Sequence, residues 1–223
     1  MAFIAGLSAP AAVAGADAGS PEQATLVQAQ MVAQEAAAAP TPATPVAQAA
    51  EVPQKADAPS KPAVPPADQL HPRAVSGTQE KFVPDAEQLR NAQAIVQTGQ
   101  KMGLPPRAWV IAVATALQES ALHNLGDLGA NNDHDSLGLF QQRPSSGWGT
   151  PEQVRDPSHS AASFYKSLIA IPGWDKMELT DAAQAVQVSA FPDHYAKWET
   201  HAGNLIKATY HDGPYAAQAA GLK

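Results

Sequence analysis

Apolar residues recur at helical spacing in the chain from residue 86 onward. Between residues 86 and 103 they lie three or four positions apart, at Leu89, Ala92, Ile95, Val96, Gly99 and Met102. Asp85 and Gln88 have the spacing of a capping box, and Gly103 follows the last apolar position. The pattern therefore predicts a first helix over residues 86–103.

The second helical stretch, roughly residues 107–121, is apolar on nearly all sides. Pro106 precedes it, and proline at a first helical position has a backbone angle already suited to a helix. A helix without a polar face has to be buried among others. We therefore expect it to be the central helix of the domain, and its one acidic residue is Glu119, near its end.

Three more helices are predicted further along. One begins after Asp156, and a second is capped by Thr180 and stopped by Pro192. The third is capped by Asp193, and its apolar residues fall on one side, at Tyr195, Trp198, Ala202, Leu205 and Ile206. The expected fold class is all-α, with these aromatic residues mainly in the core.

The first 80 residues have a different composition. Of thirteen aromatic residues only Phe3 precedes Phe82, and eleven of the twenty prolines lie before residue 81. Such a segment has little to bury, so we expect a disordered Ala/Pro-rich arm over residues 21–80. The folded domain should cover residues 81–212, with a tail over 213–223.

Residues 1–20 are expected to be a short or truncated signal-like leader. Their apolar run, from Phe3 to Ala14, is too short to span a bilayer, and small residues fit cleavage sites at 12–14 and 16–18. No Lys or Arg precedes Lys55, so a plain Ala-rich start is the alternative. If the leader is real, the protein is secreted or works in the cell envelope.

Composition excludes several classes of function. Without cysteine there is no disulfide framework, thiol nucleophile or Cys-ligated zinc. The net charge is −7 and no basic run occurs, so nucleic acid is not an expected partner. We also expect no integral membrane span, no cofactor and a monomer.

The loop over residues 122–135 imitates a metal site without completing one. Asn131, Asp133 and Asp135 match the start of a calcium-binding loop. Ser136 and Gln142 then stand where that loop needs glycine and glutamate. No metal is therefore expected.

Glu119 is the candidate catalytic residue. A carboxylate at the negative end of a helix dipole, beside apolar residues, should have a raised pKa, as a general acid needs. The alternative is an exposed glutamate in the last helical turn, pointing away from the core.

At this point the chain resembles the lysozyme-like superfamily, especially soluble lytic transglycosylases and goose-type lysozymes. Glu119-Ser120 is similar to the catalytic glutamate and serine at the end of their buried helix. The run from Ser136 through Gly138 to Gln141 is similar to their Gly-Leu-Met-Gln turn, with Phe140 in the place of methionine. The stretches after residues 142 and 185 look more like domains of secreted actinobacterial cell-wall proteins, and the usual Tyr-Asn-Ala-Gly signature is absent.

The resemblance, which covers roughly residues 85–205, implies cleavage of the MurNAc–GlcNAc β-1,4 bond in peptidoglycan glycan strands. Glu119 would be the general acid and base. Sugar-binding groups would come from Ser136, Gly138, Gln141 and Gln142, and, by analogy with the third family element, from Gln187 and Tyr195.

Three alternatives stay open. Glycosidases that use water usually need a second carboxylate, and Asp133 and Asp135 are the nearby candidates for a hydrolase. Because neither is a clear choice, the single-glutamate transglycosylase is favoured. A wall-binding module without turnover, or a phage-borne wall-degrading protein, would also fit this sequence.

Overall fold

The computed structural model describes residues 63–189 and 191–222, and within them the fold is all-α. The α-helices are α2 (Ala67–Leu70), α3 (Ala86–Lys101), α4 (Pro106–Ser120), α5 (Pro151–Arg155), α6 (Pro157–Ile169), α7 (Leu179–Gln187), α8 (Glu199–Thr209) and α9 (Ala216–Ala220). Short 3₁₀ turns are η1 (Gly129–Asn131), η2 (Pro144–Ser146), η3 (Trp174–Lys176) and η4 (Ala196–Trp198). The described residues contain no strand, only an isolated bridge between Leu137 and Gln142.

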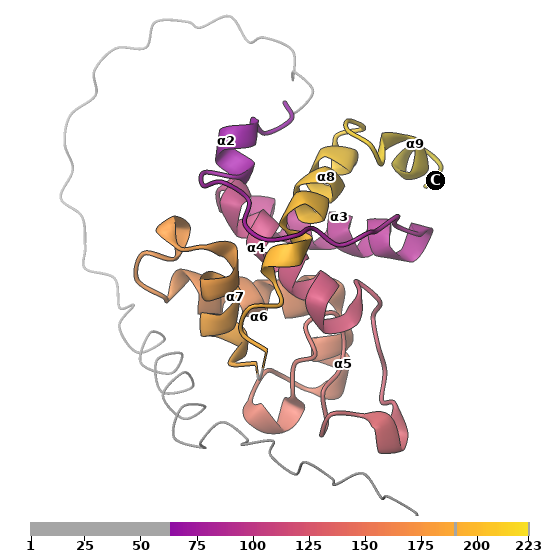
Figure 1. Ribbon diagram of the computed structural model, residues 1–223. Helices are drawn as coiled ribbons and strands as arrows, with labels where there is room; N and C mark the ends of the chain where they lie inside the picture. Colours follow the sequence, from indigo (N-terminus) through magenta and orange to yellow (C-terminus); the bar gives the residue numbers. More distant parts are fainter. Residues whose placement is uncertain (1–62, 190, 223) are drawn as a thin grey trace, which may run out of the picture.

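Helix α4 is the centre of the domain, as the sequence predicts. It contacts α2, α3, α6, α7, α8 and η4, and it crosses the middle of the helices in Figure 1. Every residue from Arg107 to Leu117 is buried. Pro106 occupies a first-turn position, where its missing N–H leaves no helical hydrogen bond unmade.

Two of the predicted helix starts are confirmed. The Asp85 carboxylate accepts from the backbone N–H of Gln88. The Gln88 side-chain oxygen accepts from the backbone N–H of Asp85, which completes the capping box of α3. Asp156 caps α6 by accepting from the His159 N–H at 2.6 Å.

The two helix caps predicted further along the chain, Thr180 and Asp193, are wrong. Helix α7 begins at Leu179, and the Thr180 hydroxyl instead donates to the Pro192 carbonyl at 2.5 Å. Asp193 caps no helix, because residues 196–198 form the 3₁₀ turn η4 and α8 starts only at Glu199. The Thr180–Pro192 hydrogen bond joins α7 to the segment that follows it, a contact that spacing alone does not reveal.

The packed part of the chain starts earlier than residue 81. Leu70 of α2 is fully buried, and the Glu80 N–H donates to the Lys197 carbonyl at 3.0 Å. At the other end Tyr215, in the expected tail, is 7% exposed, and its hydroxyl donates to the Phe82 carbonyl. The expected leader (1–20) and the arm up to residue 62 lie outside the described residues.

A buried ion pair joins α4 to α8. Arg107 and Glu199 are 3% and 1% exposed, and Arg107 Nη1 donates to Glu199 Oε1 at 2.5 Å. His71, just after α2, lies 3.3 Å from the same oxygen. Burial acts to raise the pKa of Glu199, but His71 and Arg107 outweigh it and hold that pKa below its usual range.

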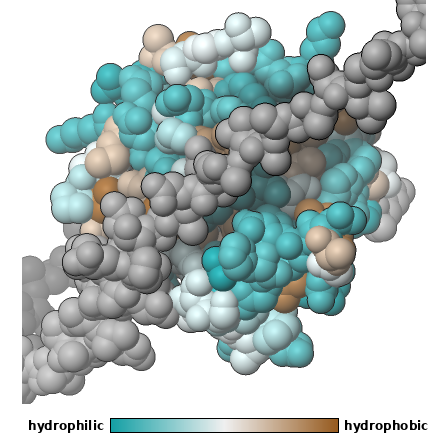
Figure 2. Space-filling view, turned by 60° about the horizontal axis from the view of Figure 1, so that its bottom comes forward, coloured by the Kyte–Doolittle hydropathy of each residue, from teal (hydrophilic) through white to brown (hydrophobic). Residues whose placement is uncertain are grey.

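Hydrophilic residues make up most of the surface visible in Figure 2, and hydrophobic ones form separate small areas. None of the helices described is both long and apolar enough to cross a bilayer.

Candidate functional site

Glu119 lies one residue before the end of α4, where the helix meets a sharp turn. Ala121 and Leu122 both have positive φ, of 50° and 61°, which is uncommon for residues with a side chain. Their N–H groups donate back to Leu117 and Ala116, closing the last turn of the helix. The chain therefore leaves α4 abruptly, and Glu119 is left half-buried at the helix end.

Two side chains lie against the Glu119 carboxyl, one from the end of α7 and one from the segment between α7 and α8. The Tyr195 hydroxyl donates to Glu119 Oε1 at 2.7 Å, and the Gln187 amide lies close enough to the carboxyl to lower its pKa. Burial and the nearby carboxylate raise the pKa of Tyr195 above its ordinary value, so its hydroxyl keeps the proton it donates.

The surroundings of the Glu119 carboxyl favour its protonated form. Burial raises its pKa above the ordinary value, the hydrogen bond from Tyr195 and the nearby Gln187 amide partly oppose this, and the charge of Asp133 adds to the rise. A carboxyl with a raised pKa and fixed orientation can deliver a proton to a bound group and take one back.

Tyr195→Phe is expected to raise the pKa of Glu119 further. The hydroxyl stabilises the ionised carboxylate, so its loss favours the protonated form. A ¹³C NMR titration of the Glu119 carboxyl measures this directly. Tyr165→Phe is the matched control, because its buried hydroxyl donates to the Ile95 carbonyl instead. An unchanged or lower pKa in the Tyr195 variant would contradict the assigned role.

The turn at residues 137–142 packs against the end of α4. The Ser120 hydroxyl donates to the Leu139 carbonyl at 2.8 Å, and the Gln187 amide donates to the Phe140 carbonyl at 2.9 Å. The Phe140 ring stacks on Phe164, with centroids 4.9 Å apart. Gln187 thus bridges the acid and the turn, and Ser120 ties the turn to the helix.

Gly138 permits this close packing. Its φ is +74°, and a Cβ built there would lie 2.2 Å from the Val154 carbonyl oxygen. No side chain fits without moving the backbone of the turn or of α5.

Gly138→Ala is therefore expected to destabilise the domain by about 2–4 kcal/mol, from positive φ and steric overlap together. Gly103→Ala is the control, because Gly103 has a similar φ of +69° and nothing within 4 Å of its Cβ position. It should cost only about 1 kcal/mol. Urea unfolding measures both, and equal losses would mean that the overlap with Val154 relaxes freely.

The other three residues of the 136–142 stretch that were predicted to bind sugar, Gln141, Gln142 and Ser136, differ in their exposure to solvent. Gln141 is half-buried, with φ of 47°, and its amide donates to the Gly138 carbonyl. Gln142 is 2% exposed and donates to the Ser160 carbonyl. Ser136 is also 2% exposed, and its carbonyl accepts from Asn132. Of the three, Gln141 is the most accessible, whereas Gln142 and Ser136 face the protein interior.

The two candidate second acids differ in their surroundings. Burial acts to raise the pKa of Asp135, but hydrogen bonds from Ser145 and Arg143 outweigh it and lower the pKa to about 2. Asp133 has an 83% exposed side chain, pairs with His134 at 2.7 Å, and is near enough to Glu119 to influence its charge. The Asp135 carboxylate therefore binds the loop at residues 143–145. Asp133 is the candidate second acid that faces solvent near Glu119.

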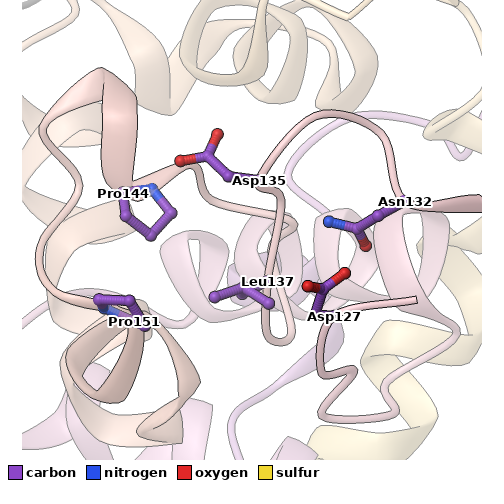
Figure 3. A pocket seen from close by; sticks show the side chains of 6 residues that line it. All are labelled: Asp127, Asn132, Asp135, Leu137, Pro144 and Pro151. Carbon is purple, nitrogen blue, oxygen red and sulfur yellow. The ribbon is translucent and has the colours of Figure 1, made fainter. Parts of the chain in front are cut away.

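A pocket of about 270 Å³ lies in the loops that follow Glu119. Figure 3 shows Asp127 and Asn132 on one side, Pro144 and Pro151 on the other, and Leu137 between them. Nowhere in residues 63–189 or 191–222 do three His, Cys, Asp or Glu side chains cluster in a way that could hold a metal ion.

Two residues of α3 contribute to the site without having been predicted. Gln88 Nε2 donates to the Ala121 carbonyl, and Asn91 Nδ2 donates to the Leu122 carbonyl, both at 2.8 Å. They satisfy the backbone of the two positive-φ residues and so hold the turn after Glu119. The signal in the sequence is faint: these polar residues fall beside the apolar positions Leu89 and Ala92, on the buried side of the helix.

In comparison with known proteins, no family model matches this chain, and no curated protein matches it either.

Proposed function

We propose that this chain is a lysozyme-like domain that cleaves the β-1,4 bond between MurNAc and GlcNAc in peptidoglycan glycan strands. The observation that carries the proposal is the half-buried Glu119 carboxyl at the end of the central helix, which accepts a hydrogen bond from Tyr195 and whose pKa burial raises. The resemblance of Glu119-Ser120 and of residues 136–141 to the lytic transglycosylase motifs supports the same reading.

The favoured mechanism needs one carboxyl group. Protonated Glu119 gives its proton to the glycosidic oxygen as the bond from MurNAc C1 to that oxygen breaks. The MurNAc C6 hydroxyl then attacks C1, and its proton passes to the Glu119 carboxylate. The products are a new GlcNAc hydroxyl end and a 1,6-anhydro end, with no water consumed and Glu119 protonated again.

Substrate groups are assigned within this proposal. Gln141 would donate to the sugar, and Gly138 would let the turn pack against α5 so that Gln141 is held in place. Gln187 and Tyr195 would act mainly through Glu119, whose charge and orientation their hydrogen bonds control. The buried positions of Ser136 and Gln142 favour a supporting role for these two residues. A site of action outside the cytoplasmic membrane belongs to the same proposal.

A hydrolase is the second candidate, and the position of Asp133 favours it. The charge of Asp133 reaches Glu119, and its side chain is open to solvent, so it could activate a water molecule. Asp135 is a weaker candidate, because Ser145 and Arg143 already bind its carboxylate.

Digestion of purified sacculi tests the proposal, with released fragments analysed by mass spectrometry. The transglycosylase predicts anhydro-ended muropeptides from wild type and none from Glu119→Gln. Reducing-end fragments that disappear in Asp133→Asn would establish the hydrolase instead. If wild type binds sacculi but releases neither product, the chain is a binding module and the proposed activity is wrong.

A further inference from the structure

Phe191 is the one aromatic residue among the large hydrophobic side chains that stand exposed in the described part of the chain. Its exposed fraction is 59%, and it lies in the segment between α7 and η4. Its ring stacks on the exposed His194 ring, with centroids 5.0 Å apart and planes at 12°. One face of the Phe191 ring is therefore covered by another ring, and much of the side chain remains in contact with solvent.

The segment that carries Phe191 is fixed at both ends to the Glu119 site. Gln187, at the end of α7, lies beside the Glu119 carboxyl and donates to the Phe140 carbonyl. Tyr195, directly after His194, donates to Glu119. Phe191 thus lies between the two residues that hold the acid, four positions from each.

Hydrogen bonds also connect described residues of this segment to α7 and to one another. Gln184 of α7 both donates to the Ser189 carbonyl and accepts from its N–H. The Phe191 N–H donates to the Ser189 hydroxyl, and Thr180 donates to the Pro192 carbonyl. These contacts tie described residues on both sides of Phe191 to α7, and contacts that the protein already makes lower the entropy lost on binding.

An exposed, ordered aromatic ring suits a specific class of ligand. Pyranose rings have apolar C–H faces, and these pack on aromatic faces while the sugar hydroxyls stay in water. We propose that Phe191, supported by His194, forms a sugar-binding subsite that stacks on one ring of the glycan strand beside Glu119. This inference rests on the proposed function and adds a substrate-binding residue to it.

Uncrosslinked, soluble GlcNAc–MurNAc glycan strands are the probe, and KM and kcat are measured separately. Phe191→Leu, which keeps apolar surface but removes the aromatic face, should raise KM about five- to tenfold, and Phe191→Ala at least as much. In both variants kcat should stay within about twofold, because the acid is untouched, and Phe191→Trp should restore wild-type KM. His194→Ala should raise KM about two- to threefold.

Val83→Ala is the matched control, because Val83 is an exposed apolar residue outside this segment, with 75% of its surface open, and should leave KM unchanged. Binding of the same strands to Glu119→Gln, with and without Phe191→Leu, measures affinity without turnover and should weaken by a similar factor.

The outcomes separate the two proposals. If wild type cleaves the strands and the Leu and Ala variants keep its KM, the subsite is wrong and the proposed function stands. If Leu retains wild-type KM and only Ala loses it, the contact is not aromatic stacking, and the inference is again overturned. If wild type neither cleaves nor binds the strands, the proposed function fails and the subsite fails with it.

Discussion

Glu119→Gln is expected to slow glycan cleavage by about 10²- to 10⁴-fold, the usual contribution of a positioned general acid. Glutamine has nearly the same shape and can still accept from Tyr195, but it cannot donate a proton to the glycosidic oxygen. The loss should appear in kcat rather than KM, because the sugar contacts remain. Glu80→Gln removes a charge from an exposed glutamate and is the control.

The same substitution should not weaken the fold. Burial raises the pKa of Glu119, so the folded state favours the protonated form. Its stabilising contribution is fully present below the ordinary glutamate pKa of 4.5 and is lost as pH rises through the raised pKa. Glutamine stays neutral, so the variant should equal or exceed wild type in thermal stability at pH 7. A strongly destabilised variant would show that the carboxylate is needed for folding.

The rate should follow the same ionisation. In the proposed mechanism the acid form of Glu119 starts the reaction, so wild-type activity should decline as pH rises through the raised pKa of Glu119. A rate that stays flat through the pKa measured by NMR would separate the ionisation from catalysis and remove Glu119 from the role of acid.

Arg107→Met is expected to cost about 3–5 kcal/mol of unfolding free energy, the largest stability effect predicted for this domain. The substitution leaves Glu199, only 1% exposed, with the His71 ring as its remaining side-chain partner. A buried carboxylate without its arginine keeps the cost of leaving water and loses the compensating attraction. Urea unfolding at pH 7 measures the loss.

Two further variants identify the cause. Arg107→Met combined with Glu199→Leu removes both charges, and much of the stability should return. Arg73→Met breaks a pair with Glu178 whose side chains are 50% and 34% exposed, and should cost no more than about 1 kcal/mol. If the double variant is no more stable than Arg107→Met alone, lost packing rather than an unpaired charge explains the effect.

The parts of the fold that the sequence predicts well are those set by neighbouring residues. The capping box of Asp85 and Gln88, the start of α4 at Pro106 and the cap at Asp156 involve residues no more than three positions apart. The short helices α2, α5 and α9 are not predicted, because five residues or fewer give no measurable period. The Arg107–Glu199 pair spans 92 positions, and no local pattern could reveal it.

The candidate site was likewise only partly predictable from the sequence, because several of its contacts join residues far apart in the chain. The proximity of Gln187 and Tyr195 to the site was expected only by analogy with the family. In the structure Tyr195 donates to the Glu119 carboxyl, and the Gln187 amide lies beside it. The choice between Asp133 and Asp135 could not be made from sequence, because it depends on Ser145 and Arg143 folding back onto Asp135. The support that Gln88 and Asn91 give to residues 121 and 122 depends on how α3 packs beside α4.

Helix α4 carries Arg107 in its first turn and Glu119 in its last. The charge of the buried ion pair and the charge proposed for catalysis therefore lie at opposite ends of one helix, twelve positions apart. A change at Glu119 that abolishes the proposed activity should leave the Arg107–Glu199 pair, and with it the packing of α4 against α8, intact.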